Sequence, residues 1–441
     1  MLRAAGSCTD EPRPWGPGRA TNPSAYATLV QDDRVHSAVY TDPAIFADEL
    51  SRIFETCWIF VGHDSEIPNP GDFRTRTIGR QPVLFVRGRD GAVRVLMNRC
   101  THRGALVCVE ERGAAARFTC PYHGWTYLNT GELIGVPYAE RYDDSMAKED
   151  FGLRPAPRVA DYRGFTFASL AAHGPSLDEF LGPLAKAEID IAIDVSPVGR
   201  IGVAAGVHKY GYNGNWKLQS ENSVDAYHLN ALHQSFLDIV RDQMGVDGRA
   251  MGTGTSPAVI RSLGNGHVAW DTAPLGMELQ FIGSDAAPAD WREAYKQQLV
   301  ERHGPEHARY LWARSAPQVL IFPNLVLISS QIRMIRPIAV DRTEVHLMPV
   351  LLEGVPEELN QQRLRGHEAF YGPSGGGATD DMEIFERQTE GFRATVDPWV
   401  YLGRGFGRET GRPDGSTAGQ MTDELGSRAF LAQWKKMMTA A

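Results

Sequence analysis

Two cysteine–histidine pairs are the first residues of this 441-residue chain whose types and spacing could do chemistry. Cys100 and His102 form the pattern C-x-H, and Cys120 and His123 form C-x-x-H after a spacing of seventeen residues. Two thiolates and two imidazoles could hold a tetrahedral zinc ion. They could also hold a two-iron, two-sulfur cluster, with both cysteines on one iron and both histidines on the other.

The residues beside the two pairs distinguish these interpretations. Arg103-Gly104 follows the first pair, while Pro121-Tyr122 and Gly124-Trp125 flank the second histidine. The segment closely resembles the signature of Rieske iron–sulfur domains, C-x-H-R-G followed by C-P-Y-H-G-W. This resemblance implies a [2Fe-2S] cluster, with each pair on a β-hairpin loop, and makes its ligands Cys100, His102, Cys120 and His123.

Three nearby side chains are expected to pack around the cluster without binding it. Cys108 lies between the pairs but outside the pattern, and we expect a small buried side chain there. Trp125 and Tyr122 are expected to shield the cluster from water, which would tune its reduction potential.

A second candidate metal site contains two histidines and a distant carboxylate. His228 and His233 are five residues apart, and Asp380-Asp381 follows much later, after a glycine-rich loop. Two histidines and one carboxylate bind Fe(II) in non-haem oxygenases and leave positions open for O2 and substrate. The histidine spacing alone is a weak signal, because most such pairs have no metal.

The order of the surrounding residues makes the second signal specific. Asn215-Trp216-Lys217, Glu221-Asn222 and Asp225-Ala226-Tyr227-His228 precede His233, and this series resembles the α-subunits of aromatic-ring-hydroxylating Rieske oxygenases. The resemblance covers nearly the whole chain and is weakest at residues 1–24 and 244–308. It implies that His228, His233 and Asp381 bind iron, with Asp380 as a possible substitute. It also implies that Asp225 joins the cluster of one subunit to the iron of its neighbour in a trimer.

Helix geometry limits how the two histidines can share one ion. Residues five apart on a regular α-helix point about 140° away from each other. Two ligands of one iron cannot diverge in this way. We therefore expect non-α backbone between Tyr227 and Gln234, either a helix end or a π-type bulge, since one i→i+5 turn aligns residues five apart.

The secondary-structure patterns divide the chain into an all-β part and a mixed part. Helices are expected at 41–60, 176–191, 221–240, 380–392 and 423–438, and strands at 73–78, 83–87, 93–98, 203–212 and, as a pair, within 318–338. Thr41 is the expected cap of the first helix. We expect an α+β fold: an N-terminal tail and helix (1–57), an all-β Rieske [2Fe-2S] domain (58–170), and a mixed catalytic domain with an antiparallel sheet covered by helices (171–441).

Composition and charge argue against several classes of binding partner and against several cellular locations. The net charge is −9 and no basic run stands out, which argues against nucleic acid or an anionic membrane as the main partner. No apolar run approaches the roughly 18–20 residues that span a bilayer, and residues 1–24 lack the apolar core of a signal peptide. Five scattered cysteines do not suggest a disulfide framework. We therefore expect a cytoplasmic protein.

The resemblance implies an oxygenase that receives electrons from another protein. Gly403 to Gly407 lacks the strand–turn–helix context of a nucleotide loop, and no flavin or nicotinamide motif is present. The expected donors are a ferredoxin and/or a flavin reductase fed by NADH or NADPH. The expected assembly is a homotrimer, possibly with a small β-subunit (α3β3). The expected reaction uses O2 to mono- or dihydroxylate an aromatic ring. The alternatives are a Rieske electron-transfer protein without oxygenase chemistry and a zinc-stabilised binding protein.

The substrate is less determined than the reaction class. Parts of 71–74 and the run after Cys100 look most like oxygenases of aromatic carboxylic acids. Arg333 or Arg336 could hold a substrate carboxylate, although we expect a surface salt bridge for each. By family analogy the pocket is expected to use Ser223, Leu229, Phe236, Val240, Leu327 and Ser329.

Overall fold

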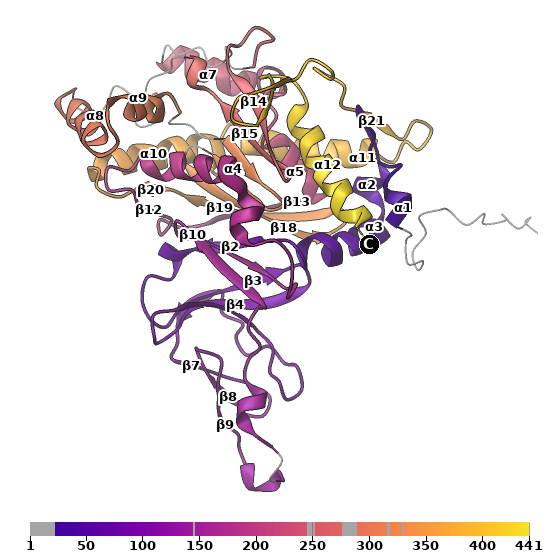
Figure 1. Cartoon of the computed structure of the whole chain (residues 1–441), viewed down its shortest axis with the longest axis vertical. Helices are drawn as coiled ribbons and strands as arrows, with labels where there is room; N and C mark the ends of the chain where they lie inside the picture. Colours follow the sequence, from indigo (N-terminus) through magenta and orange to yellow (C-terminus); the bar gives the residue numbers. More distant parts are fainter. Residues whose placement is uncertain are drawn as a thin grey trace, which may run out of the picture.

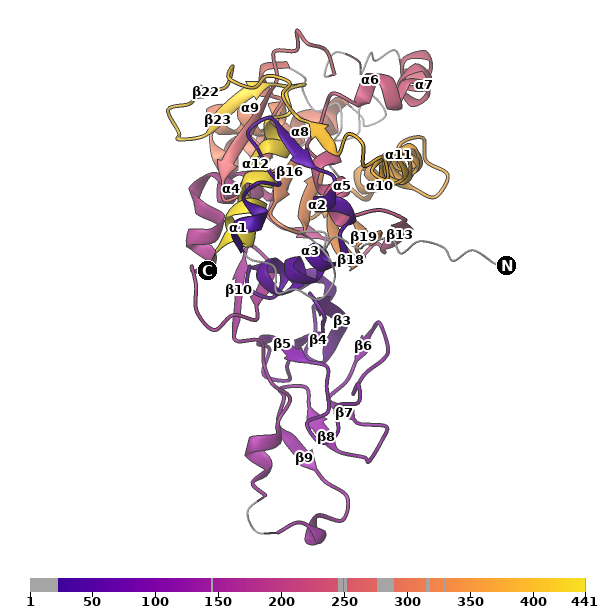
Figure 2. The same cartoon turned by 90° about the vertical axis from the view of Figure 1, so that its right-hand side faces the viewer.

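The computed structural model describes residues 23–143, 146–244, 249, 252–275, 289–314, 318–328 and 330–440. A narrow part made of small β-sheets projects from a larger part of helices around one large sheet (Figure 1). The same projection is visible after a quarter turn (Figure 2). The expected order of an all-β unit followed by an α+β unit is confirmed.

Three small antiparallel sheets build the projecting part and its base, in the strand orders β5-β4-β3-β6, β7-β8-β9 and β10-β11-β2. The strands are β2 (Ile59–His63), β3 (Asp72–Ile78), β4 (Gln81–Arg87), β5 (Val93–Met97), β6 (Arg112–Ala114), β7 (Arg117–Thr119), β8 (Thr126–Leu128), β9 (Leu133–Gly135), β10 (Arg158–Tyr162) and β11 (Phe165–Ser169). Short 3-10 turns cover Asp64–Glu66, Ala139–Arg141 and Lys148–Phe151. A separate hydrophobic cluster that includes Cys100, Cys120 and Trp125 fills the outer end. The cysteine–histidine loops therefore rest on a core of their own.

A nine-stranded antiparallel sheet forms the centre of the larger part, in the order β13-β19-β18-β17-β16-β15-β14-β23-β22. Its strands are β13 (His208–Tyr212), β14 (Val259–Gly264), β15 (His267–Asp271), β16 (Gln318–Ile321), β17 (Leu325–Ile328), β18 (Gln331–Ala339), β19 (Arg342–Pro349), β22 (Thr410–Gly411) and β23 (Thr417–Gln420). The expected pair of strands within 318–338 is wrong, because three strands lie there. β17 is buried along its whole length, so no polar alternation marks where one strand ends and the next begins.

Helices pack around this sheet, and the candidate metal ligands of the second site lie on them or at their ends. They are α1 (Pro23–Tyr26), α2 (Ala38–Thr41), α3 (Pro43–Glu49), α4 (Leu177–Asp194), α5 (Trp216–Asn222), α6 (Leu229–Leu232), α7 (Gln234–Met244), α8 (Ala289–His303), α9 (Pro305–Ala313), α10 (Glu357–Tyr371), α11 (Ala378–Gly391) and α12 (Leu425–Thr439), with a 3-10 turn at Ala273–Leu275. Two further small sheets pair β1 (Arg34–His36) with β21 (Trp399–Tyr401) and β12 (Ile201–Gly202) with β20 (Leu351–Leu352). The helix α5 contacts β18, and α11 contacts both α5 and β13.

The first helix differs from its prediction at both ends. Its cap is Asp42, whose side chain accepts a hydrogen bond from the Ala44 amide at 2.7 Å, while Thr41 bonds to the Ser37 carbonyl of the preceding turn. The α-helix ends at Glu49, passes into a π-turn over Leu50–Phe54, and the chain then enters β2. The prediction to residue 60 was wrong because buried apolar residues give the same signal in a strand as in a helix.

A buried ion pair joins the N-terminal helix to the catalytic part. The Lys217 ammonium lies 2.5 Å from the Glu49 carboxylate, and both side chains are fully buried. The indole nitrogens of Trp216 and Trp434 donate to the same carboxylate at 2.8 and 2.7 Å. Because these partners come from α3, α5 and α12, one carboxylate fixes three helices. No helix of the described residues is both long and apolar enough to cross a membrane.

We predict that Glu49→Gln costs about 3–5 kcal/mol of unfolding free energy, because it leaves the Lys217 charge buried without a counter-charge. The double variant Glu49→Gln/Lys217→Met should be less destabilised than the sum of the two single changes, since no unpaired charge remains. Calorimetric melting of the four proteins measures this coupling. Strictly additive losses would show that the pair does not act as a unit.

Candidate metal centres

Two loops with the same backbone geometry present the cysteine–histidine pairs. In each loop the cysteine amide donates to the carbonyl five residues on, and the amide four residues on donates to the cysteine carbonyl, at 2.8–3.0 Å. Gly104 and Gly124 stand at this fourth position with φ of +81° and +73°, which other residues rarely adopt. The second loop connects the paired strands β7 and β8, as expected, but the first does not form a hairpin, because β6 pairs with β3.

The four side chains are arranged for a cluster with an inner and an outer metal. Cys100 and Cys120 are each 2% exposed, whereas the two imidazoles are partly exposed, with ring centroids 4.7 Å apart. His102 stacks on Trp125 at 4.9 Å, and its buried Nδ1 has no hydrogen-bond partner among the described residues. Inner sulfur and outer nitrogen donors fit a [2Fe-2S] cluster of the Rieske type.

Tyr127 is a neighbour of this site that the sequence analysis missed. Its hydroxyl lies 3.2 Å from the Cys100 sulfur and 3.0 Å from the Thr101 hydroxyl, and the ring is fully buried. Burial raises the pKa of Tyr127 to about 12. Alternation along β8 is the signal that could have found it, because residues 125 and 127 lie two apart in an extended segment.

The sequence also predicted the surroundings of Trp125, Tyr122 and Cys108. Trp125 is buried against the site as expected. Tyr122 is 59% exposed, and one side of its ring packs on the ring of His123 at 3.7 Å between centroids. Tyr122 occupies the outer end of its loop, where the turn directs the side chain to solvent. Cys108 is buried, as expected, and its sulfur donates to Glu110. Burial raises the pKa of the Cys108 thiol to about 11, which suits a neutral side chain.

The two histidines of the second site flank one turn of helix. Leu229–Leu232 is α-helical, with hydrogen bonds from Leu232 to His228 and from His233 to Leu229 at 2.8 and 3.1 Å. His233 then leaves the helical region (φ −97°, ψ 25°), and α7 restarts at Gln234. The expected interruption is confirmed, as a break at His233 rather than a π-type bulge.

This break brings both imidazoles to one carboxylate. The ring centroids of His228 and His233 lie 5.2 Å apart. Oδ1 of Asp381, in the first turn of α11, lies 3.8 Å from Nε2 of His228 and 3.3 Å from Nε2 of His233. The ligand atoms of the three residues lie within 4.8 Å of one another. Two imidazole nitrogens and a carboxylate oxygen, largely buried, fit a ferrous ion.

Asp380 occupies a different place from Asp381. Its carboxylate lies 3.5 Å from Nδ1 of His233, on the side of the ring away from the converging Nε2 atoms, and is 36% exposed. Asp381 is 7% exposed and also accepts a hydrogen bond at 3.0 Å from the Asn222 amide. The geometry therefore brings Asp381, and not Asp380, into the set with both histidines.

Asp225 orients the first histidine. One of its oxygens lies 3.0 Å from Nδ1 of His228, and the other accepts from the Tyr227 amide at 2.6 Å. A carboxylate on one ring nitrogen leaves the other free to bind a metal. Burial lowers the pKa of His228, but the hydrogen bond that Asp225 accepts from it and the charges of Asp225 and Asp381 together outweigh burial, so the net shift is upward. Burial raises the pKa of Asp381, but the hydrogen bond to His233 and the charge of His228 lower it overall.

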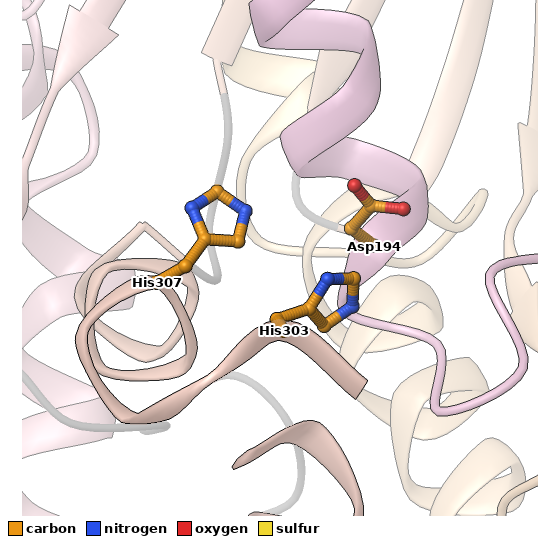
Figure 3. Close-up of side chains that lie close together, drawn as sticks. All are labelled: Asp194, His303 and His307. Atoms are coloured by element: carbon orange, nitrogen blue, oxygen red, sulfur yellow. The ribbon is translucent and has the colours of Figure 1, made fainter. Parts of the chain in front are cut away.

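Two other histidine–carboxylate groups fit a metal less well. Figure 3 shows Asp194, His303 and His307, which meet at the ends of α4, α8 and α9. The Asp194 carboxylate already pairs with Arg163 at 2.7 Å, and His307 is exposed. In the group of His208, His367 and Glu368, the half-exposed glutamate pairs with His208 at 2.5 Å. No lysine or arginine of the described residues forms such an ion pair with Asp381.

A surface cavity of about 580 Å³ opens beside the second site. Its lining includes His228 and four acidic residues, Glu221, Asp225, Asp423 and Glu424. Burial raises the pKa of Glu221 to about 8. None of the expected substrate-pocket residues that the structure describes lines this cavity, and Ser329 lies outside the described residues.

The two candidate arginines of β18 have different surroundings. Arg336 forms the expected salt bridge, with Glu344 on β19, and remains partly exposed. Arg333 is 2% exposed and forms no ion pair with a carboxylate of the described residues, so the expectation of a surface salt bridge there is wrong. Alternation explains the difference, because residues three apart in a strand point to opposite faces.

Comparison with known proteins finds two family domains in this chain. Residues 57–157 match the Rieske [2Fe-2S] domain, and residues 200–440 match the catalytic domain of the ring-hydroxylating α-subunit. The large subunit of anthranilate 1,2-dioxygenase from Acinetobacter baylyi is 36% identical over 86% of this chain and 82% of its own length. The large subunit of 2-halobenzoate 1,2-dioxygenase from Burkholderia cepacia is 34% identical over 89% and 87%.

A solved structure shows the same architecture. Naphthalene 1,2-dioxygenase from Rhodococcus sp., bound to indole, superposes with a TM-score of 0.82 at 30% identity, over 92% of this chain and 94% of that one. Two cysteine–histidine loops on an all-β unit and a buried 2-His-1-carboxylate set on an α+β unit thus occur together in a matching fold. This chain belongs to the ring-hydroxylating α-subunit family of Rieske non-haem iron oxygenases.

Proposed function

We propose that this chain is the catalytic large subunit of an oxygenase that hydroxylates the ring of an aromatic carboxylate. The observation that carries the proposal is the convergence of His228, His233 and Asp381 in a buried place. An electron carrier without oxygenase chemistry has no use for such a set, and family membership argues for the oxygenase. The relatives named for anthranilate and 2-halobenzoate act on aromatic carboxylates, which favours this substrate class.

Each part of the chain has a separate task in this proposal. Residues 58–170 would hold the [2Fe-2S] cluster through Cys100, His102, Cys120 and His123. Residues 171–441 would hold the mononuclear iron through His228, His233 and Asp381. Of the N-terminal segment 1–57, the described residues 23–57 pack on the second part. When bound, the cluster supplies single electrons and the ferrous ion supplies the chemistry of O2. Asn222 holds the Asp381 carboxylate, and Asp225 fixes the tautomer and direction of His228.

The distance between the two sites favours cooperation between copies of the chain. Both views place β7–β9 at the opposite end of the molecule from α6, α7 and α11 (Figures 1 and 2). The outer end of the cluster loops carries the exposed Arg103 and Tyr122, and the cavity beside His228 is acidic. Opposite charges favour the docking of one surface on the other. The resemblance to ring-hydroxylating α-subunits implies a trimer, and we propose a homotrimer in which His123 of one subunit meets Asp225 of the next.

The electron supply and the remaining partners follow from the same proposal. The described chain shows no nucleotide-binding loop, so a ferredoxin and/or a flavin reductase delivers electrons from NADH or NADPH. A small β-subunit would complete an α3β3 assembly, consistent with relatives that are named large subunits. The cytoplasm, which provides such donors, is the proposed location.

The first test concerns the cluster. Cys100→Ser should remove the visible spectrum of the cluster, because three ligands leave an iron open to solvent and oxidation. Cys108→Ser is the matched control, since this buried cysteine lies nearby but outside the set, and it should keep the spectrum. A wild-type spectrum at full iron content in Cys100→Ser would refute the assignment of the cluster ligands.

The second test concerns Asp225. Asp225→Ala should keep both metals, because this residue contacts a ligand rather than a metal in the proposal. Oxygen uptake with the natural electron donor and substrate should fall by at least about 100-fold, since the link between the two centres is broken. Iron analysis of the same sample separates this effect from metal loss. Normal turnover would show that the route between subunits does not use Asp225.

A further inference from the structure

Arg333 is a buried cation whose counter-charge is missing from the described residues. Its guanidinium lies on β18, with one terminal nitrogen 3.4 Å from the Ser223 hydroxyl and the carbon 4.9 Å from the ring centre of Tyr371. Its Nε is buried and has no hydrogen-bond partner among the described residues. An isolated charge in such a place is costly, so the protein requires an anion or water there.

Three other buried arginines of the described residues are paired with carboxylates. Arg261 and Arg314 both bond to the carboxylate of Glu188, at 3.0 Å in the case of Arg261. Arg76 pairs with Glu66. The contrast indicates that the surroundings of Arg333 are not built for stability alone, because the fold pairs these three buried arginines with carboxylates and gives Arg333 no such partner among the described residues.

The neighbours of Arg333 also carry unsatisfied polar atoms. Gln331, which shares its face of β18, has both side-chain polar atoms buried without a partner among the described residues. Both ring nitrogens of His367 are also buried without a hydrogen-bond partner among the described residues. Burial lowers the pKa of this histidine to about 4, which keeps it neutral. Buried polar groups are normally satisfied, so this cluster marks a place for a polar ligand or ordered water.

Two chains of contacts connect Arg333 with the candidate iron ligands. Ser223 follows Asn222, whose amide lies 3.0 Å from Asp381 and 3.4 Å from His228. On the other side, the ring of Tyr371 lies 4.6 Å from that of Phe370, which lies 5.2 Å from the His233 ring. Arg333 is thus linked to the ligand set through Ser223 and Asn222 on one side and through Tyr371 and Phe370 on the other.

We propose that Arg333 is the specificity-determining residue of this enzyme and binds the carboxylate of its aromatic substrate; this inference rests on the proposed function. A guanidinium presents Nε–H and a terminal N–H as a fork that matches the two oxygens of a carboxylate. In this proposal Gln331 and the neutral His367, whose buried polar atoms lack partners among the described residues, complete the anion site. The ring of the substrate then extends toward Phe370 and the iron ligands.

The test uses the purified holoenzyme with benzoate as the anionic probe and toluene as its neutral counterpart. Arg333→Met should weaken benzoate binding roughly 100-fold in equilibrium dialysis, since one partner of a buried charge pair is lost. It should leave toluene binding unchanged or tighter. Arg333→Lys, which keeps the charge without the fork, should lie between the two. Arg336→Met is the matched control on the same strand and should bind benzoate as the wild type does.

Melting without ligand separates binding from folding. Removing an unpaired buried charge should leave the melting temperature of Arg333→Met equal to or above that of the wild type, and benzoate should raise it only in the wild type. Three results would overturn the proposal. The first is that the wild type does not bind benzoate, and the second is that Arg333→Met binds benzoate as tightly as the wild type does. The third is that Arg333→Met loses affinity for benzoate and for toluene equally and melts at a lower temperature. If benzoate binds through Arg333 but no hydroxylated product forms, the result contradicts the proposed function and supports the anion site at Arg333. If Arg333→Met hydroxylates benzoate with an unchanged KM, the result supports the proposed function and contradicts the anion site at Arg333.

Discussion

Two imidazoles five residues apart on a regular α-helix point about 140° away from each other, so they can face one point only where the backbone departs from that helix. In this chain the interruption is a single residue, His233, between a one-turn helix and α7. The rest of the site depends on it: Asp381 enters from a helix some 150 residues away, Asn222 holds that carboxylate, and Asp225 fixes the nearer ring. A continuous helix here would leave Asp381 beside one histidine and could not form a metal site.

Buried charges hold the scaffold that keeps these elements in place. Glu49 binds Lys217 and two tryptophan indoles, which locks α5 against the N-terminal and C-terminal helices. Because α5 ends at Asn222, the same lock positions the residue that holds Asp381. Pairs of this kind add little net stability, but breaking one is costly, so they fix a single arrangement. The unpaired Arg333 differs from this pattern, and a ligand explains the difference better than the fold does.

The sequence predicted what depends on local pattern. The ends of β3, β4 and β5 were predicted to within two residues, because a turn lies at each end of these alternating runs. The two sets of metal ligands could be recognised because the residues beside them in the sequence also match the family pattern. Long-range partners could not be predicted. Nothing near Glu49 indicates that it pairs with Lys217. Alternation along β8 could place Tyr127 on the side of Trp125, but nothing near Cys100 indicates their contact, because both pairs form only when distant segments meet. Residues 59–60 were assigned to a helix, and the strands of 318–338 were counted as two instead of three. A strand buried on both faces has no period to distinguish it from a helix or to show its ends.

The central claim is that one chain binds a two-iron cluster and a separate mononuclear iron. Iron and acid-labile sulfide per chain, measured on the purified wild type and on two matched aspartate variants, test it most directly. The account predicts about three irons and two sulfides in the wild type and in Asp380→Ala, and about two irons with two sulfides in Asp381→Ala. Two irons per wild-type chain after reconstitution with ferrous iron, or an unchanged iron content in Asp381→Ala, would contradict the account.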